Sequence, residues 1–368
     1  MSLPGDHPPA AFRMHYSSGV NHLLCYFTGT GNTQEATRQV AASLQDKGHS
    51  TQLYAIESRA PMRDWRSPEF VDLLQAADVL LVLFPVYSWS PPAIVLRFIR
   101  SLPRGRRSGV PRPAAVVAVD GGDGFRAARR ARRALERKGY DVFLSDRVGY
   151  PDNWTEMMEP PDEAEAEAEA AAGSDAARSL GRDIAARKER HYHPPGLMPL
   201  LLAVIGATFR TLGRRLLGQF YAANEDCTTC RPCDVPSPVG ATSIPPVHHA
   251  RPGWNSRCQS CNRCINICPE RAIVTSPGRM LLVVSSIALM AYLLFLLLDG
   301  VIGPTAGFIR IGLIVGVILA GHALYFLFPG PLYRLFYRVP GLRSLLSRGF
   351  NRNWRRYTFP GFKAPRHR

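Results

Sequence analysis

Two short cysteine runs between residues 227 and 268 constrain this chain more than any other feature. They hold seven of its eight cysteines: Cys227, Cys230 and Cys233 in the first run, and Cys258, Cys261, Cys264 and Cys268 in the second. The second run has the complete order C-x2-C-x2-C-x3-C-P, a spacing that holds a 4Fe-4S cluster on thiolates. The first run ends one ligand short, because Ser237 precedes Pro238 where a cysteine would be expected. The spacing therefore predicts iron–sulfur chemistry with one ordinary and one altered site.

The same thiolates could instead bind zinc or form disulfides. Two C-x2-C pairs supply the four ligands of a tetrahedral zinc site. Zinc sites usually join two separated pairs, however, whereas these cysteines recur every third residue and the second run ends in Cys-Pro. Disulfides require an oxidising compartment, for which the chain carries no address. We therefore favour iron–sulfur clusters over both alternatives.

A second chemical signal lies near the amino terminus. Residues 23–33, LLCYFTGTGNT, lead from an apolar strand through a loop into a helical pattern that ends at Gly48. Backbone N–H groups at such a helix start favour a phosphate, and Gly29 and Gly31 let the backbone approach it. The loop is neither a P-loop nor G-x-G-x-x-G. Its donors are instead the side chains of Thr28, Thr30, Asn32 and Thr33, which suit a mononucleotide phosphate bound without metal.

This T-x-T-x-N-T loop resembles the one with which flavodoxins bind the phosphate of FMN. Two later loops match in order: Tyr87, Ser88 and Trp89 correspond to the aromatic loop over the flavin, and Gly121, Gly122, Asp123 and Gly124 to the third flavin loop. Each follows a continuous apolar run, as in a parallel sheet buried on both faces. The resemblance implies an α/β fold, a flavodoxin-like doubly wound parallel sheet over residues 20–156, either binding FMN or having lost it.

The order of segments over residues 20–275 resembles bacterial and archaeal fusions of a flavodoxin with a two-cluster ferredoxin. It implies that residues 150–154 close the flavodoxin part, where Asn153 and Trp154 either contact the flavin region or pack, and that residues 223–276 form a small α+β bacterial-type ferredoxin domain. In such ferredoxins the fourth cysteine of each run serves the other cluster. The resemblance thus assigns a 4Fe-4S cluster to Cys227, Cys230, Cys233 and Cys268. It leaves Cys258, Cys261 and Cys264 with Ser237 for a 3Fe-4S cluster, a 4Fe-4S cluster with a serine or external ligand, or a labile site.

The remaining segments are less informative. We expect residues 1–19 to be disordered and residues 157–222 to form a linker region. Its acidic part, DEAEAEAEAAA at 162–172, favours a solvated helix or linker. The apolar stretch at 197–221 indicates an interfacial helix or a brace under the second domain.

Two uncharged stretches, residues 280–298 and 311–328, each approach the length that crosses a bilayer. With the turn-rich link between them they predict a transmembrane hairpin, and two buried core helices are the alternative. No acidic residue follows Asp299, so the net charge of +16 comes largely from the arginine-rich tail at 329–368. Because positively charged flanking residues favour the cytoplasmic side, we expect both ends of the hairpin to lie in the cytoplasm, at the cell membrane. The tail either contacts anionic lipid or is solvated, and we expect no nucleic acid partner. His322 is either a packing residue or a haem or quinone contact.

Together these features predict a membrane-anchored electron-transfer protein. Flavin can take two electrons and release them singly, whereas clusters carry one. Its partners would be redox donor and acceptor proteins or a quinone, with membrane lipids around the hairpin. Alternatives are a flavin-dependent reductase of a quinone or other small acceptor, and an iron–sulfur redox sensor or assembly factor. No catalytic acid, base or nicotinamide motif stands out, which favours a carrier over a substrate-specific oxidoreductase.

Overall fold

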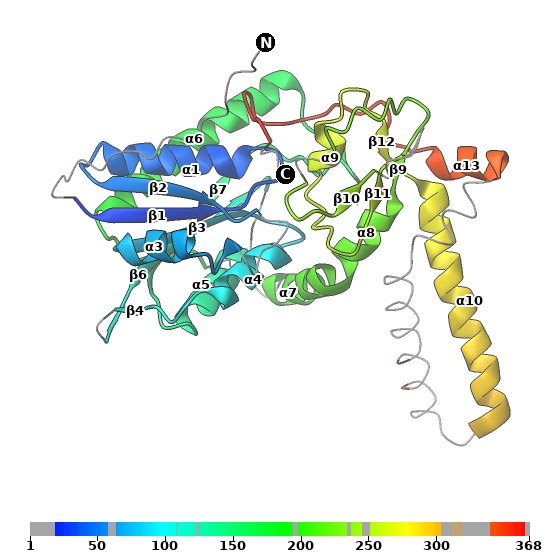
Figure 1. Ribbon diagram of the computed structural model, residues 1–368, viewed down its shortest axis with the longest axis horizontal. Coiled ribbons are helices and arrows are strands. Elements are labelled where there is room, and N and C mark those ends of the chain that lie inside the picture. The colour runs from blue at the N-terminus through cyan, green and yellow to red at the C-terminus, as the bar shows by residue number, and fades with distance from the viewer. Residues whose placement is uncertain are drawn as a thin grey trace, which may run out of the picture.

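The computed structural model describes residues 19–57, 64–107, 109–122, 124, 126–193, 198–233, 237–244, 251–302, 312, 316 and 339–364. Figure 1 shows a sheet-based domain on one side, a small cysteine-bearing domain beside it, and a long helix that projects from the small domain.

The first domain is built on a six-stranded parallel sheet of order β2-β1-β3-β6-β7-β8. The strands are β1 (Asn21–Tyr26), β2 (Ser50–Ala55), β3 (Val79–Pro85), β6 (Pro113–Asp120), β7 (Asp141–Gly149) and β8 (Arg190–His191). A short hairpin, β4 (Arg106–Arg107) and β5 (Val110–Pro111), lies outside the sheet. This order matches the flavodoxin-like doubly wound pattern with an added edge strand, so the predicted fold class is confirmed for this domain.

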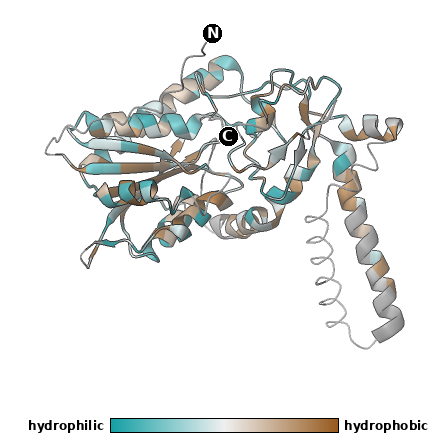
Figure 2. Cartoon of the chain, in the orientation of Figure 1, coloured by the Kyte–Doolittle hydropathy of each residue, from teal (hydrophilic) through white to brown (hydrophobic). Residues whose placement is uncertain are grey.

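Helices cover both faces of the sheet. On one face lie α1 (Asn32–Gln45) and α6 (Glu163–Ala185), and on the other α3 (Pro68–Ala76), α4 (Ala93–Ser101) and α5 (Ala127–Glu136) (Figure 1). Side chains of a strand alternate between faces: Leu23 and Cys25 enter one core, whereas Leu24 and Tyr26 enter the other. Figure 2 shows the apolar residues concentrated on these central strands. Continuous apolar strands are thus the expected result of burial on both faces.

The acidic stretch at 162–172 is helical and mostly exposed, in agreement with the solvated helix that was one of its two predicted forms. It begins α6, whose residues Ala166, Ala170 and Ala177 are buried, and the Ser43 hydroxyl of α1 donates to the Arg178 carbonyl at 2.8 Å. Because β8 then joins the sheet after α6, the first domain extends past the expected boundary at residue 156, to about residue 191. Small alanines at helical spacing allow the two helices to approach closely.

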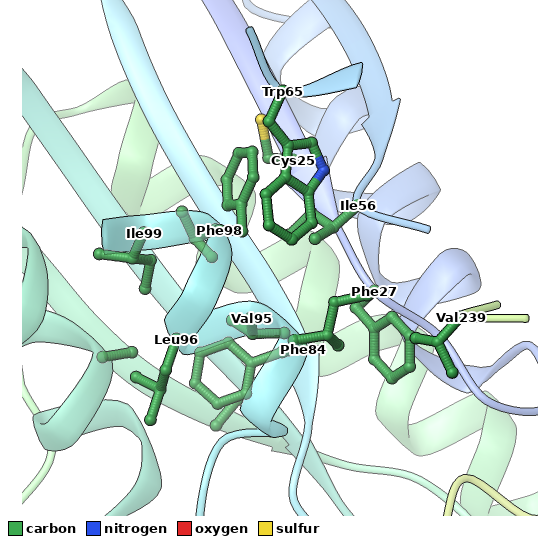
Figure 3. Close-up of a cluster of buried hydrophobic side chains, with 14 of the residues drawn as sticks. Cys25, Phe27, Ile56, Trp65, Phe84, Val95, Leu96, Phe98, Ile99 and Val239 are labelled. Carbon is green, nitrogen blue, oxygen red and sulfur yellow. The ribbon is translucent and has the colours of Figure 1, made fainter. Parts of the chain in front are cut away.

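The small domain consists of short elements around the cysteines. Its strands pair as β9 (Tyr221–Ala223) with β12 (Ile273–Thr275) and β10 (Thr242–Ser243) with β11 (Gly253–Trp254). The short helix α9 (Arg263–Asn266) lies within the second cysteine run. Leading into it are α7 (Met198–Thr208), a π-helical turn (Phe209–Gly213) and α8 (Arg214–Phe220). Figure 3 shows Val239 of this domain beside Phe27 at the end of β1. Both are buried in one cluster, so the two domains share a hydrophobic core.

The predicted membrane hairpin is only partly described. Residues 280–298 fall within α10 (Pro277–Ile302), whereas residues 311–328, His322 included, lie outside the described residues except for Gly312 and Gly316. Among the residues whose side chains are described, no helix is both long enough and apolar enough to cross a bilayer.

The C-terminal segment, residues 348–364, packs on protein, where we had expected lipid or solvent. It follows α13 (Pro340–Ser347) and runs back across both domains. Asn351 is fully buried, donating to the Thr155 carbonyl at 2.8 Å and accepting from the Thr275 N–H at 2.8 Å. The Phe359 N–H donates to the Thr30 carbonyl at 2.8 Å. Such specific polar contacts, spread along the segment, account for its position.

Candidate functional site

The loop between β1 and α1 forms a cradle of donors. Gly31 adopts φ 111° just before the helix, and its N–H donates to the Thr28 hydroxyl at 3.0 Å. This left-handed conformation suits glycine, because it has no side chain. The Thr33 hydroxyl is buried without a hydrogen-bond partner among the described residues. Free donors at a helix amino terminus are what a phosphate needs.

The loop after β3 is held in an unusual backbone conformation. Ser88 and Trp89 both have positive φ, 47° and 57°, between the paired backbone bonds that link Tyr87 and Ser90 in both directions at 3.0 and 3.1 Å. Left-handed non-glycine residues are uncommon and cluster at functional sites. The tight turn leaves Trp89 36% exposed, on the rim of a cavity.

The third loop is fixed by an ion pair at the end of β6. Arg147 Nε donates to Asp120 Oδ2 at 2.9 Å, and the Gly122 N–H donates to Asp120 Oδ1 at 3.2 Å. The pair therefore sets the direction of the chain at Gly121 and Gly122.

These loops enclose one cavity of about 320 Å³ at the carboxyl ends of the strands. Among its lining residues are most of the predicted flavin contacts: Thr28, Gly29, Thr30, Asn32, Thr33, Tyr87, Ser88, Trp89, Gly121 and Gly122. Gly31 instead faces the C-terminal segment, since an added Cβ would lie 2.8 Å from Phe359 Cβ. Gly124 lies behind Asp120, whose Oδ2 would be 2.5 Å from an added Cβ. Asp123 lies outside the described residues.

The donors of this cavity fit a flavin mononucleotide. Three of its lining residues carry a buried polar atom that has no hydrogen-bond partner within the described part of the chain, namely Thr33 Oγ1, Tyr87 OH and Asn262 Oδ1. Unpaired buried polar atoms are costly, and a ligand with phosphate and ring polar atoms would offer partners to those that face the cavity. Asn153 and Trp154 also line the cavity, as one of our two readings of this segment predicted.

Other lining residues gave no signal in the sequence. Phe209 comes from the π-helical turn, and Ser260 and Asn262 come from between the cysteines of the second run. Their positions depend on how the small domain docks, which local patterns do not encode.

The two cysteine runs fold into equivalent loops. The residues that flank the middle cysteine of each run have positive φ: Thr229 at 57° and Arg231 at 71° around Cys230, and Ser260 at 53° and Asn262 at 55° around Cys261. Alternation of this kind turns successive backbone N–H groups inward and forms concave anion sites, of which many hold iron–sulfur clusters. The residue types of the two runs do not indicate this backbone conformation.

The cysteines surround two hollows in the crossed arrangement implied by the resemblance. Cys227, Cys230, Cys233 and Cys268 line one. Cys258, Cys261, Cys264 and Ser237 line the other, where Cys233 also reaches. Ser237 is only 5% exposed, and its hydroxyl oxygen accepts from the Ala241 N–H at 3.0 Å. Within the described residues, no three Cys, His, Asp or Glu side chains are grouped to hold a single metal ion.

Burial shapes the chemistry of these thiols. Desolvation raises the pKa of Cys233 and of Cys258 to about 12, and that of Cys264 well above its usual value. Metal ligation requires thiolates. The positive charge of bound iron would therefore have to stabilise these thiolates, because the buried hollow does not.

A buried arginine joins the two sites. Arg263, between Cys261 and Cys264, forms an ion pair with Glu57 in which each side chain is 1% exposed. Its Nε and Nη2 donate to the Gly29 and Thr28 carbonyls, both at 2.8 Å. Gly29 lies directly against the second run, because an added Cβ would be 2.6 Å from the Cys261 carbonyl oxygen. The phosphate-type loop and the cysteine loop are therefore one packed unit.

A carboxyl group is buried between the cavity and the second hollow. Glu156 accepts from the Trp154 indole N–H at 2.7 Å, from the Ser260 hydroxyl at 3.1 Å and from Tyr221 OH. Burial raises the pKa of Glu156 to about 7, against the hydrogen bonds that lower it.

Comparison with known proteins supports the assignment of the first domain. Residues 24–148, about a third of the chain, match the family model described as NADPH-dependent FMN reductase. No curated protein sequence matches the chain.

Several solved structures match the chain at low similarity. A flavodoxin from the domain Archaea is 15% identical (46% of this chain, 98% of that one, TM-score 0.31). The two-electron reduced flavodoxin of Megasphaera elsdenii is 18% identical (45% and 98%, TM-score 0.30). A flavone reductase is 15% identical (50% and 70%, TM-score 0.34).

Proposed function

We propose that this protein is an electron carrier in which FMN, bound in the cavity, exchanges electrons with iron–sulfur clusters in the two cysteine hollows. One observation carries the proposal: the three sites are joined in series by shared walls. Asn262 lines both the flavin-type cavity and the hollow of the second run. Cys233 lines both cysteine hollows.

The order of sites follows from these shared walls. The hollow with Ser237 lies between the cavity and the hollow of the first run, where Cys230 is exposed. FMN would supply the change between two-electron and one-electron transfer. The residues of this chain would hold the cofactors: Thr33 and its neighbours the phosphate, and Tyr87 and Trp89 the ring. Electrons would enter or leave at the exposed Cys230 end.

Rapid reduction of anaerobically reconstituted protein tests the proposal. We expect bound FMN, iron in two sites, and oxidation of reduced flavin in step with the appearance of a cluster signal in electron paramagnetic resonance. Gly29→Ala, whose Cβ would meet the Cys261 carbonyl, should slow this transfer. A protein that lacks flavin, or whose reduced flavin never passes electrons to the clusters, would contradict the proposal.

We further propose that the hairpin at residues 280–328 anchors the carrier, with the redox domains and both termini cytoplasmic. The support is the sequence: 19 uncharged residues lie within α10, and arginines flank the pair of stretches. Retention in membranes washed at alkaline pH is the expected result, and release into the supernatant would refute the anchor.

A flavin-dependent reductase of a quinone or other small acceptor is the second candidate. The match to the FMN reductase family model favours it, as does a cavity rim with exposed Trp89 and Trp154. Oxidation of NADPH by a quinone at the same rate in the wild type and in Cys230→Ser would select this function over the relay. Partner binding that responds to oxygen without electron throughput would instead select a redox sensor.

A further inference from the structure

The outer side of α7 carries apolar side chains that nothing among the described residues covers. Met198, Leu201, Val204 and Ile205 are 57%, 58%, 61% and 41% exposed, whereas Leu202 on the inner side is buried. A helix that is apolar around its whole circumference belongs in a protein interior or in lipid. A continuous exposed apolar surface of this kind marks an interaction site.

This helix lies along the rim of the flavin-type cavity. An added Cβ at Gly206 would be 2.6 Å from the Ser88 carbonyl oxygen. Phe209, one residue after α7, lines the cavity. Arg210 then donates to the Ser90 hydroxyl at 2.6 Å. Whatever covers α7 therefore also approaches the loop that carries Trp89.

Arginines from three elements lie near one another at the end of α7. We call this group the arginine cluster: Arg100 of α4, Arg130 of α5 and Arg210, two residues after α7. Burial and the charges of Arg130 and Arg100 lower the pKa of Arg210 to about 10. None of these arginines forms an ion pair with a carboxylate in the described part of the chain. Bound anions would relieve their mutual repulsion.

We infer that α7 and the arginine cluster form a docking surface for a bilayer of anionic phospholipid. The outer side of α7 would enter the boundary between headgroups and acyl chains, and the guanidinium groups would bind lipid phosphates. An acidic protein would match the arginines but would leave the apolar side of α7 without a suitable partner. Figure 1 shows α7 on the lower side of the molecule, the side toward which α10 also projects.

Tryptophan quenching in the full chain, reconstituted into vesicles, tests the inference. Leu201→Trp places a reporter on the outer side of α7, and Leu53→Trp is the matched control, because Leu53 is 44% exposed on β2 at the far edge of the sheet. The vesicles contain brominated phosphatidylcholine, alone or with an equal part of phosphatidylglycerol. Emission needs no electron transfer, so failure here leaves the proposed relay standing.

We expect the emission added at position 201, taken as the difference from the wild-type chain with its five tryptophans, to be quenched several-fold more than that added at position 53, and more with phosphatidylglycerol than without it. Arg100→Glu with Arg130→Glu should remove the dependence on phosphatidylglycerol. The same charge change in Arg38→Glu with Arg178→Glu, at α1 and α6, should not. Equal quenching at positions 201 and 53, or binding of an acidic polypeptide that shields position 201 where vesicles do not, would overturn the inference. Flavin content and a cooperative unfolding transition check that each variant is folded.

Discussion

Replacing Glu57 by glutamine should destabilise the junction between the two domains. The carboxylate pairs with Arg263, and both side chains are 1% exposed. Removing one partner of a buried ion pair typically costs about 3–5 kcal/mol, since the remaining charge is left in a medium of low dielectric. Arg263 would keep its two carbonyl acceptors, Gly29 and Thr28, both at 2.8 Å. We therefore expect the low end of that range, about 3 kcal/mol in the free energy of unfolding.

The same substitution should weaken FMN binding, because Arg263 orients the carbonyls of the loop that holds the phosphate. A loss of about 1.4 kcal/mol in binding free energy corresponds to a tenfold weaker dissociation constant. Urea unfolding followed by tryptophan fluorescence measures stability, and flavin fluorescence measures binding. Asp226→Asn is the matched control: its pair with Arg352, at 2.8 Å, has side chains 38% and 60% exposed, and we expect less than about 1 kcal/mol. The reasoning would be refuted if Glu57→Gln cost no more than Asp226→Asn.

Three further changes test the cysteine hollows and the buried carboxyl. Ser237→Cys should complete a four-thiolate site, seen as slower iron loss in air and an ordinary reduced-cluster spectrum. Ser237→Ala should lose iron faster. Identical behaviour of both variants would show that residue 237 is not a ligand of the cluster. Gly218→Ala should selectively displace the second-run cluster, because its Cβ would lie 2.8 Å from Cys258 Cβ. Gly253→Ala is the control, because no atom lies within 4 Å of its added Cβ; its iron content should equal that of the wild type. Raising the pH from about 5 to 8 should lower the free energy of unfolding by up to about 3 kcal/mol, because the pKa of Glu156 rises from 4.5 to about 7 on burial. The stabilisation by neutral Glu156 is fully present below the pKa that this group has in the unfolded chain. It is lost as the pH rises through the pKa that the group has in the folded protein. Glu156→Gln should abolish this dependence in urea titrations at several pH values, and an unchanged slope would contradict the assignment.

The sequence predicted those parts of the site that are local. The threonine-rich loop, the aromatic loop and the cysteine spacing each lie within a few residues, and each contributes residues to the wall of a cavity or hollow. The contacts between domains could not be predicted in this way. Arg263 meets Gly29 across 234 positions, and Tyr357 OH donates to Asn32 Oδ1 at 3.1 Å across 325. Side chains that look like ordinary loop polar groups acquire these roles only through tertiary packing.

The C-terminal segment makes contacts with protein that its composition did not indicate. Its arginines and aromatic residues suggested a lipid surface, yet Arg355 donates to the Pro160 carbonyl at 3.2 Å and Phe362 lies under Arg263 at 5.6 Å. An arginine side chain can donate to protein carbonyls and stack on aromatic rings as well as bind lipid phosphates. Charge therefore indicated that the segment binds something, but not which surface it binds.

The position of Ser237 decides how the altered site must work if the relay is correct. Because its hollow lies between the flavin-type cavity and the hollow of Cys230, an electron that passes between the other two sites must cross it. A cluster lost readily at that place would interrupt all transfer, rather than remove a side branch. A serine hydroxyl is a harder donor than a thiol and is much less acidic, so it should shift the cluster's potential, and its 5% exposure limits access of solvent to that position. We therefore expect Ser237→Cys to change the rate of electron transfer even where iron content is unchanged, which a site outside the relay would not do.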